Sequence, residues 1–305
     1  MQDRQTGIAA VVAACVIWGL SPIYYKLLAD VPPDEVLAHR TLWSFVFFAA
    51  VLAVQGRLGA IRAALSDRTR FLTIAFAAVV ISNNWFLFIY AIQIGRATEA
   101  SLGYYIFPLV AVLMGVVFFR ERLGPAQILA VGLAALAVIF LSVRLGAPPW
   151  LSLILSFSFG LYTVAKKRLD VGPVVSVTAE VLLLTPLALA WLWVLHAGPE
   201  GGTFGADLKT SILLIFSGPL TALPLILFSV ASRRVALSTV GLIQYLNPTL
   251  QFLVATLIFR EPFGLSQALA FALIWTALAI YSTASWRSER ARRRAATVLS
   301  TSSET

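Results

Sequence analysis

The chain has 305 residues, of which 59% are hydrophobic and only 12% are charged, about half the charged share of soluble domains. A soluble fold cannot bury that much apolar surface, so we predict an integral membrane protein. The single cysteine, Cys15, excludes an intrachain disulfide and a thiolate metal site, and no cofactor motif is present.

Ten stretches are apolar over about 20 residues, the length of a membrane span. They cover residues 7–28, 36–55, 71–92, 98–119, 125–142, 149–166, 174–195, 210–231, 237–259 and 265–284. The first stretch is too long for a signal peptide and lacks an Ala-x-Ala cleavage site, so we interpret it as a span.

Three segments outside the spans have a recognisable character. Between the second and third spans, Leu58, Ile61 and Leu65 recur at helical spacing among arginines, which predicts a short helix on the membrane surface. The Gly-Pro-Glu-Gly-Gly run at 198–202 predicts an exposed loop. The tail at 287–305 is basic and then rich in Ser and Thr, so we expect it to be disordered and to contact anionic lipid rather than nucleic acid.

The chain contains two copies of one unit. A shift of 140 positions places Tyr105 on Tyr245, Pro108 on Pro248, Arg120 on Arg260, Glu121 on Glu261 and Gln127 on Gln267. A weaker match, shifted by 141, pairs Trp18-Gly19 and Lys26 with Phe159-Gly160 and Lys167. Because each copy holds five spans, an odd number, the second copy enters the membrane inverted. We therefore divide the chain into a first repeat at 1–146, an inverted second repeat at 147–286 and the tail.

The distribution of basic residues predicts the orientation. With both termini in the cytoplasm, 17 of the 23 Lys and Arg residues fall on the cytoplasmic side and six on the other. The positive-inside rule favours this arrangement, and it explains the net charge of +9 without a nucleic-acid partner.

Polar residues of the early spans are candidates for solute contact. Trp18, Pro22 and Lys26 share one helix face, and Pro22 leaves the carbonyl one turn earlier without its usual donor, although Lys26 could instead extend to the surface. Arg40 follows Glu35 closely, which suggests a buried ion pair with Glu35 or Asp34, or else an interfacial anchor.

Later spans add further candidates. Asn84 lies near the centre of the third span and either lines a solute path or bonds between helices. Tyr105 with Pro108, and Gln244 and Tyr245 with Asn247-Pro248, occupy matching depths of the fourth and ninth spans. Prolines at symmetry-related points are typical of a midplane binding site, with packing through Gly103 and Gly241 as the alternative.

Glu180 is a carboxylate within the seventh span. Buried there, it could take up and release a proton, or it could form a structural ion pair. Tyr162 and Lys166 of the sixth span are its candidate partners. Proton coupling through Glu180 is thus one of two open readings.

The motifs together resemble the drug/metabolite transporter superfamily, its EamA family with two five-helix repeats, and more narrowly the RarD-like permeases. The residues that carry the resemblance are Trp18 to Pro22, Lys26, Glu35 to Arg40, Trp43-Ser44, Asn84-Trp85, Ala100 to Tyr105, Pro108, Glu121 to Leu123, Gln127, Gln244-Tyr245, Pro248-Thr249, Glu261-Pro262 and Ile274-Trp275. The resemblance implies a permease of the bacterial inner membrane that moves small organic metabolites, such as amino acids, by alternating access. Where the RarD-like pattern has Ile-Asn-Pro, the first copy has Ile106-Phe107-Pro108, whereas the second keeps Asn247-Pro248.

We therefore expect an all-α membrane protein of ten helices, a secondary transporter for small organic solutes or amphipathic drugs. Its spans one, three, four, six, eight and nine would line a central cavity, and the fifth and tenth would pack outside. No catalytic constellation or ATP-binding loop is present in the sequence, so we do not expect an enzyme. The alternative is a non-transporting scaffold or sensor. The expected solute contacts are Trp18, Lys26, Arg40, Asn84, Tyr105, Gln244, Tyr245 and Asn247, with Pro22, Pro108 and Pro248 as hinges and Glu180 as the coupling candidate.

Overall fold

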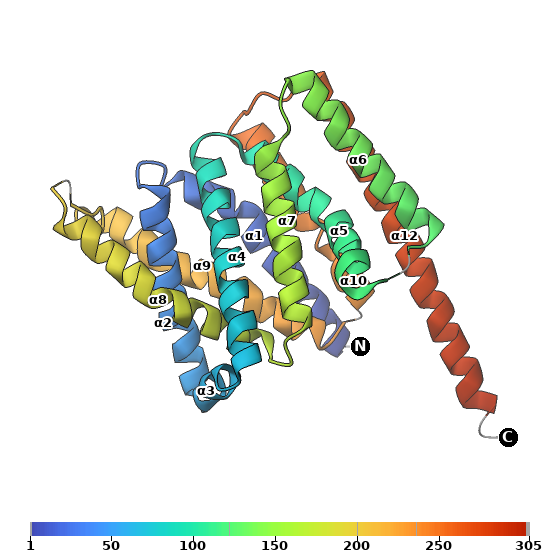
Figure 1. The fold of residues 1–305 in the computed structure, drawn as a ribbon, viewed down its shortest axis with the longest axis horizontal. Coiled ribbons are helices and arrows are strands. Elements are labelled where there is room, and N and C mark those ends of the chain that lie inside the picture. Colours follow the sequence, from blue (N-terminus) through green and yellow to red (C-terminus); the bar gives the residue numbers. More distant parts are fainter. Residues whose placement is uncertain (1, 122, 200, 236, 303–305) are drawn as a thin grey trace.

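The computed structural model describes residues 2–121, 123–199, 201–235 and 237–302, so Arg122 and Glu200 of the motifs above and the last three residues of the tail lie outside it. The first half forms α1 (Gln2–Lys26), α2 (Pro33–Val54), α3 (Gly59–Leu65), α4 (Arg68–Gln93), α5 (Ala97–Phe119) and α6 (Pro125–Leu145). The second forms α7 (Trp150–Lys167), α8 (Pro173–Ala197), α9 (Leu208–Ser232), α10 (Leu237–Ile243), α11 (Leu246–Leu253), the π-helical turn η1 (Val254–Ile258) and α12 (Leu265–Ser302). The long helices lie side by side as a bundle (Figure 1).

Within the described residues, nine helical segments are long and apolar enough to cross a membrane, against the ten spans that we expected. The difference is α7, which has 18 residues and ends on Lys166 and Lys167. Its small polar residues Ser152, Ser156 and Ser158 are buried, and it packs between α4 and α5 (Figure 1). These lysines and serines lower the mean hydropathy of α7, and the serines lie on its buried face, whereas Trp150, Ile154 and Phe157 are exposed.

Several helices begin where the sequence supplies a starting signal. Pro33, Pro125 and Pro173 occupy the first position of α2, α6 and α8, where a proline loses no intrahelical hydrogen bond. Asp67 and Asp207 cap α4 and α9, each accepting a hydrogen bond from a backbone N–H in the first turn. Local sequence therefore sets these helix starts.

The two halves pack in a pattern that is preserved when they are exchanged. The contact of α5 with α7 corresponds to that of α1 with α11, and α1 with α9 corresponds to α4 with α7. Likewise α2 with α9 corresponds to α4 with α8, while α2–α8, α5–α11 and α6–α12 map onto themselves. This symmetry follows from the duplicated sequence.

The matched turns after spans four and nine have the same backbone. Arg120 and Arg260, at φ 54° and 55°, are the non-glycine residues with positive φ in the described chain. After each, a glycine N–H donates to a glutamine side chain, Gly124 to Gln127 at 2.9 Å and Gly264 to Gln267 at 3.0 Å.

The two halves differ inside these spans. α5 is continuous through Pro108, whereas its counterpart is interrupted between α10 and α11 at Gln244 and Tyr245. Pro248 has no N–H to bond the Gln244 carbonyl, which instead accepts from the Asn247 N–H at 3.1 Å. The interruption therefore lies one turn before Pro248.

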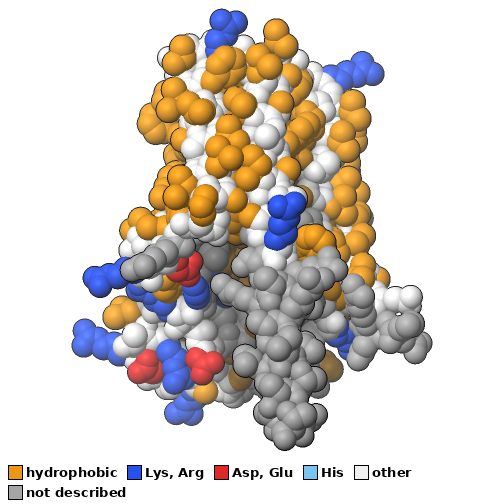
Figure 2. Space-filling view, turned by 90° about the vertical axis from the view of Figure 1, so that its right-hand side faces the viewer, with side chains coloured by type: hydrophobic (Ala, Val, Ile, Leu, Met, Phe, Trp, Pro, Cys, Tyr) orange, Lys and Arg blue, Asp and Glu red, His pale blue; other side chains and the backbone are white. Residues whose placement is uncertain are grey.

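The fifth and tenth spans lie at one edge of the bundle. α6 and α12 pack against each other there (Figure 1), and apolar side chains cover much of this side of the molecule (Figure 2). The short surface helix expected between the second and third spans is present as α3, which buries Ile61 and Ala64 against its neighbours.

We expected the tail after residue 286 to be disordered. α12 continues as a helix to Ser302. The segment holds alanines and arginines, which favour helix, and neither glycine nor proline to end it.

Candidate solute-binding site

The guanidinium of Arg40 is buried among aromatic rings of the first half. Arg40 lies in α2 and is 7% exposed. Its Cζ lies 4.2 Å from the Trp85 ring centroid of α4 and 5.7 Å from that of Tyr25 in α1. Its Nε is buried without a hydrogen-bond partner, and no carboxylate in the described part of the chain forms an ion pair with it. The site is therefore a cation held by two rings.

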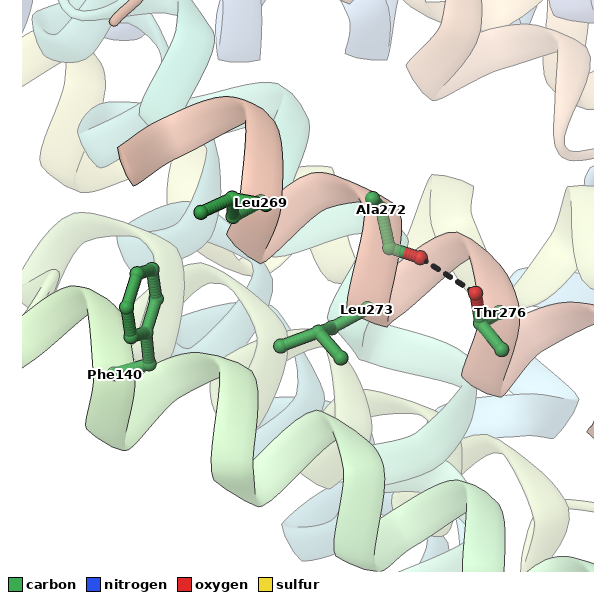
Figure 3. Close-up of a pocket in the computed structure, with 5 residues that line it drawn as sticks. All are labelled: Phe140, Leu269, Ala272, Leu273 and Thr276. Atoms are coloured by element: carbon green, nitrogen blue, oxygen red, sulfur yellow. Dashed lines mark hydrogen bonds between the residues drawn. The ribbon is translucent and has the colours of Figure 1, made fainter. Parts of the chain in front are cut away.

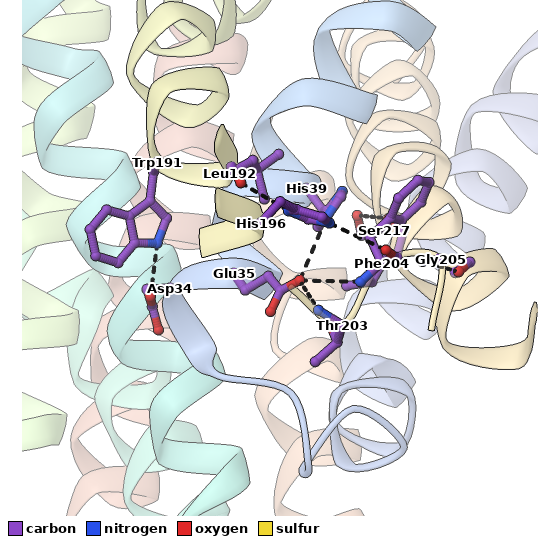
Figure 4. A network of polar contacts seen from close by, with 12 residues as sticks. Asp34, Glu35, His39, Trp191, Leu192, His196, Thr203, Phe204, Gly205 and Ser217 are labelled. Carbon is purple, nitrogen blue, oxygen red and sulfur yellow. Dashed lines mark hydrogen bonds and ion pairs between the residues drawn. The ribbon is translucent and has the colours of Figure 1, made fainter. Parts of the chain in front are cut away.

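The expected ion pair of Arg40 with Glu35 or Asp34 is wrong, because both carboxylates bind other partners (Figure 4). Glu35 Oε1 accepts the backbone N–H groups of Thr203 at 2.8 Å and Phe204 at 3.3 Å, and Asp34 accepts the indole N–H of Trp191 at 2.8 Å. Five helical positions correspond to about 140° of rotation, so Glu35 and Arg40 point to different sides of α2. The loop after α8 is thus anchored on Glu35.

His39 belongs to this loop anchor rather than to the aromatic site. Its ring stacks on Phe204 at a centroid distance of 4.8 Å, and its Nε2 lies 4.0 Å from Glu35 (Figure 4). His196 of α8 lies nearby, with its Nε2 3.2 Å from the Phe204 carbonyl oxygen. The two histidines, far apart in sequence, therefore meet at the same loop.

Asn84 is fully buried and fully hydrogen-bonded. Its amide donates to the Leu155 carbonyl at 2.9 Å and to Ser158 Oγ at 2.8 Å, both in α7, and its Oδ1 accepts the Tyr104 hydroxyl at 3.2 Å. This is the bonding between helices that the sequence left open. Contact of Asn84 with a solute stays a prediction.

The three candidates on α1 have separate surroundings. Trp18 packs on Phe228 at 6.2 Å between centroids, and Lys26 donates to the Gln93 carbonyl at 3.4 Å. The carbonyl of Trp18, which we expected Pro22 to leave free, accepts the Ser21 hydroxyl at 2.7 Å. A hydroxyl one position before the proline therefore replaces the missing donor, and the hinge role of Pro22 stays a prediction.

Two candidates of spans four and nine, Tyr105 and Tyr245, belong to the apolar cluster that packs against α12. Tyr105 Oη and Thr249 Oγ1 are 2.7 Å apart, and Tyr105 packs edge-on against Phe271 and Trp275. Tyr245 is partly buried in the same cluster. Asn247 accepts a hydrogen bond from Gln251 at 3.0 Å, and Gln244 is exposed. Their solute contacts, and the hinge roles of Pro108 and Pro248, stay predictions.

Glu180 is completely buried with the partners that the sequence suggested. Lys166 Nζ lies 2.6 Å from Oε1, and the Tyr162 hydroxyl donates to Oε2 at 3.1 Å. Ser176 also donates to Oε1 at 3.0 Å. Such complete pairing is what a structural ion pair needs, and proton coupling through Glu180 stays a prediction.

Two grooves lie between helices and are apolar. One, of about 300 Å³, lies between α6 and α12 and is lined by Phe140, Leu269, Ala272, Leu273 and Thr276 (Figure 3). The Thr276 hydroxyl donates to its own helix at the Ala272 carbonyl, 2.8 Å away, so it offers little to a polar solute. The other, of about 250 Å³, lies between α1 and α9. Both suit lipid chains better than a metabolite.

Sequence reasoning did not identify Tyr25 as part of the Arg40 site. Tyr25 lies beside the candidate Lys26, but its ring points to α4 and packs edge-on against Phe88 at 5.9 Å. No polarity pattern marks such a residue, because tyrosines are common near membrane interfaces. The sequence pointed to Tyr25 only indirectly, because a buried Arg40 needs an aromatic ring nearby.

Comparison with known proteins identifies the family to which the chain belongs. The model of the EamA-like transporter family matches it twice, at residues 5–143 and 148–283. The uncharacterized transporter YojE of Bacillus subtilis is 39% identical over 300 residues, covering 96% of this chain and 99% of that protein. RarD of Salmonella typhimurium is 39% identical over 280 residues, covering 92% and 95%.

Two further matches support this. RarD of Escherichia coli is 36% identical over 280 residues, covering 92% of this chain and 94% of that protein. A solved structure with 18% sequence identity shares the fold, with a TM-score of 0.61 over 91% of this chain and 97% of that one. The chain is therefore a multi-pass membrane protein with a duplicated domain, and it belongs to the EamA-like transporter family.

Proposed function

We propose that this protein is a secondary transporter that moves a small organic solute bearing a carboxylate, such as an amino acid, across the bacterial inner membrane by alternating access. Membership of a transporter family sets aside both the scaffold alternative and an enzymatic role. The observation that carries the choice of solute is the buried Arg40 guanidinium.

A buried charge without a counter-ion costs several kcal/mol. The two rings around Arg40 offset only part of this desolvation cost, because a cation–π contact contributes about 2 kcal/mol when desolvated. A solute carboxylate would supply the missing anion and could bond the guanidinium at two donors. The surrounding rings would contact an apolar part of the same solute, which suits an amphipathic molecule.

The alternating access is proposed from the repeat. Five spans in each half, with α7 as the sixth crossing, would give the halves opposite directions in the membrane. The symmetric packing of the halves supports this arrangement. In the orientation that the basic residues favour, both termini lie in the cytoplasm, and the end of the bundle that holds Lys26 and Glu261 faces outward.

The test is solute flux into proteoliposomes, with labelled amino acids and with amphipathic drugs that lack a carboxylate, in the presence and absence of a proton gradient. Arg40→Gln should reduce the flux of a carboxylate solute at sub-saturating concentration about 10- to 100-fold. A charge-assisted hydrogen bond contributes about 1.5–3 kcal/mol, and 1.4 kcal/mol is a factor of ten.

The matched control is Arg96→Gln. Arg96 is an exposed arginine whose ion pair with Glu99 lies on the surface, so the flux should stay unchanged. Saturable flux of neutral or cationic drugs, with none for any carboxylate solute, would refute the proposed solute class. Equal flux in Arg40→Gln and the unmodified protein would refute the site.

A further inference from the structure

Two matched clusters of a lysine, a phenylalanine and a glutamate lie at opposite ends of α5. At one end, Lys26 Nζ lies 5.9 Å from the Phe259 ring centroid, and Glu261 follows two residues later. At the other end, Lys167 Nζ lies 4.1 Å from the Phe119 ring centroid, and Glu121 follows two residues later. The repeat therefore places the same three residue types at both ends of the bundle.

The turns that carry the two glutamates have equal backbones. Arg120 and Arg260 have φ angles within one degree of each other, at 54° and 55°. The following N–H of Glu121 donates to Gly115 at 3.2 Å, and that of Glu261 donates to Ala255 at 3.0 Å. Local geometry therefore does not dictate different partners for the two carboxylates.

Their partners nevertheless differ. Glu261 accepts the backbone N–H groups of Ala97 at 2.6 Å and Thr98 at 2.7 Å, so its carboxylate holds the first turn of α5. Glu121 instead lies 2.8 Å from Lys167 Nζ, and its side chain is 52% exposed. Glu261 therefore joins its end of the bundle to the start of α5. Glu121, at the other end, forms an exposed ion pair.

We propose that Glu261 is a latch of the transport cycle. With its end closed, Glu261 binds the N–H groups of Ala97 and Thr98; with its end open, it pairs with Lys26, as Glu121 pairs with Lys167 in this structure. The latch rests on the alternating access proposed above. It makes Glu261 and Lys26 gating residues rather than solute contacts.

The surroundings of Lys26 suit this exchange. Its ammonium carries three donors, and in this structure it makes one long hydrogen bond of 3.4 Å to the Gln93 carbonyl. Releasing Glu261 from α5 would therefore not leave the carboxylate without a partner. Two charge-assisted hydrogen bonds to a helix start outweigh one exposed ion pair, which favours the closed form.

The test measures how often this end opens, through the labelling rate of a buried cysteine in lipid nanodiscs. Ala100 lies one turn inside α5 and is fully buried, so Ala100→Cys in a Cys15→Ala background reports on this opening. Glu261→Gln should raise the rate about tenfold, because the closed form loses more than the open form. Lys26→Met should lower it about twofold to fivefold, because only the open form loses a partner.

Controls separate the latch from general instability. Glu99→Gln removes another carboxylate of the first turn of α5, one that is 21% exposed and pairs with Arg96 rather than with the N–H groups of Ala97 and Thr98, and should leave the rate unchanged. A reporter at the buried Ala179 of α8 should not respond to Glu261→Gln unless the fold itself is lost. Glu261→Asp keeps the charge but shortens the side chain, and should raise the Ala100 rate less than Glu261→Gln.

An unchanged rate in Glu261→Gln, or an unchanged or raised rate in Lys26→Met, would overturn the proposal. The measurement needs no solute, so its failure is separable from failure of the transport proposal. If the labelling rates are unchanged but flux is normal, only the proposed role of Glu261 is refuted. If the labelling rates change as expected but no carboxylate solute is transported, the proposed solute is refuted and the role of Glu261 stands.

Discussion

Removing Lys166 is expected to destabilise the fold strongly, because it leaves a fully buried carboxylate without its counter-ion. Glu180 has a side chain with 0% exposure, and Lys166 approaches it to 2.6 Å. Breaking a buried ion pair at one partner costs about 3–5 kcal/mol. We therefore expect Lys166→Met to lower the free energy of unfolding by about that amount.

The neighbouring lysine provides a matched control. Lys167 forms its ion pair with Glu121 at 2.8 Å, but both side chains are more than half exposed. Exposed pairs contribute about 0–1 kcal/mol, so Lys167→Met should change stability by less than 1 kcal/mol. Two adjacent lysines with nearly equal pair distances should thus differ several-fold in their effect.

Reversible unfolding in mixed micelles, followed by tryptophan fluorescence, measures both variants. The double variant Lys166→Met with Glu180→Leu should recover much of the loss, because it removes both charges from the interior. A loss below 1 kcal/mol for Lys166→Met would refute the reasoning. It would show that the buried Glu180 does not depend on the lysine.

Two further predictions follow from single contacts. A Cβ on Gly103 would lie 2.8 Å from the Ser152 carbonyl oxygen, so Gly103→Ala should cost about 1–3 kcal/mol in the same unfolding assay. A Cβ on Gly241 would have no atom of another described element within 4 Å, so Gly241→Ala should cost nothing. Asp207 caps α9 outside the spans, and the hydrogen bonds that its carboxylate accepts from the Thr210 hydroxyl and from the Thr210 N–H lower its pKa. The stabilisation that the Asp207 carboxylate gives to α9 is therefore present at neutral pH and lost on acidification. The unfolding curves of Asp207→Ala and the unmodified protein should differ at pH 7 and converge in acid. A difference that persists in acid would contradict this.

The architecture could be predicted from the sequence because matching residues of the two repeats lie at a constant spacing. The 140-residue shift predicted the duplicated halves, and the family match repeats them at 5–143 and 148–283. It did not predict the interruption at Gln244, since Pro108 occupies the matching place in a continuous helix. Whether a proline breaks a helix depends on which neighbours accept and donate nearby, and spacing alone does not contain that information.

The site residues were harder to predict for a similar reason. Arg40 was identified by its polarity, but its partners are two rings on other helices rather than the acids beside it in sequence. The role of Glu261 was not visible at all, because its partners are backbone N–H groups 163 and 164 residues away. Backbone donors leave no mark in a sequence, so contacts of this kind have to be found in the structure.

The contact between α5 and α11 shows why the two halves need not be equal in energy. The Tyr105 hydroxyl lies 2.7 Å from Thr249, at a contact that maps onto itself when the halves are exchanged. The exchanged bond would join Tyr245 to position 109, which is a leucine and offers no hydroxyl. A conformation with the halves exchanged would therefore lose this hydrogen bond, at a cost of about 1 kcal/mol. Residues on which the copies differ, rather than those that they share, thus bias the protein toward the conformation described.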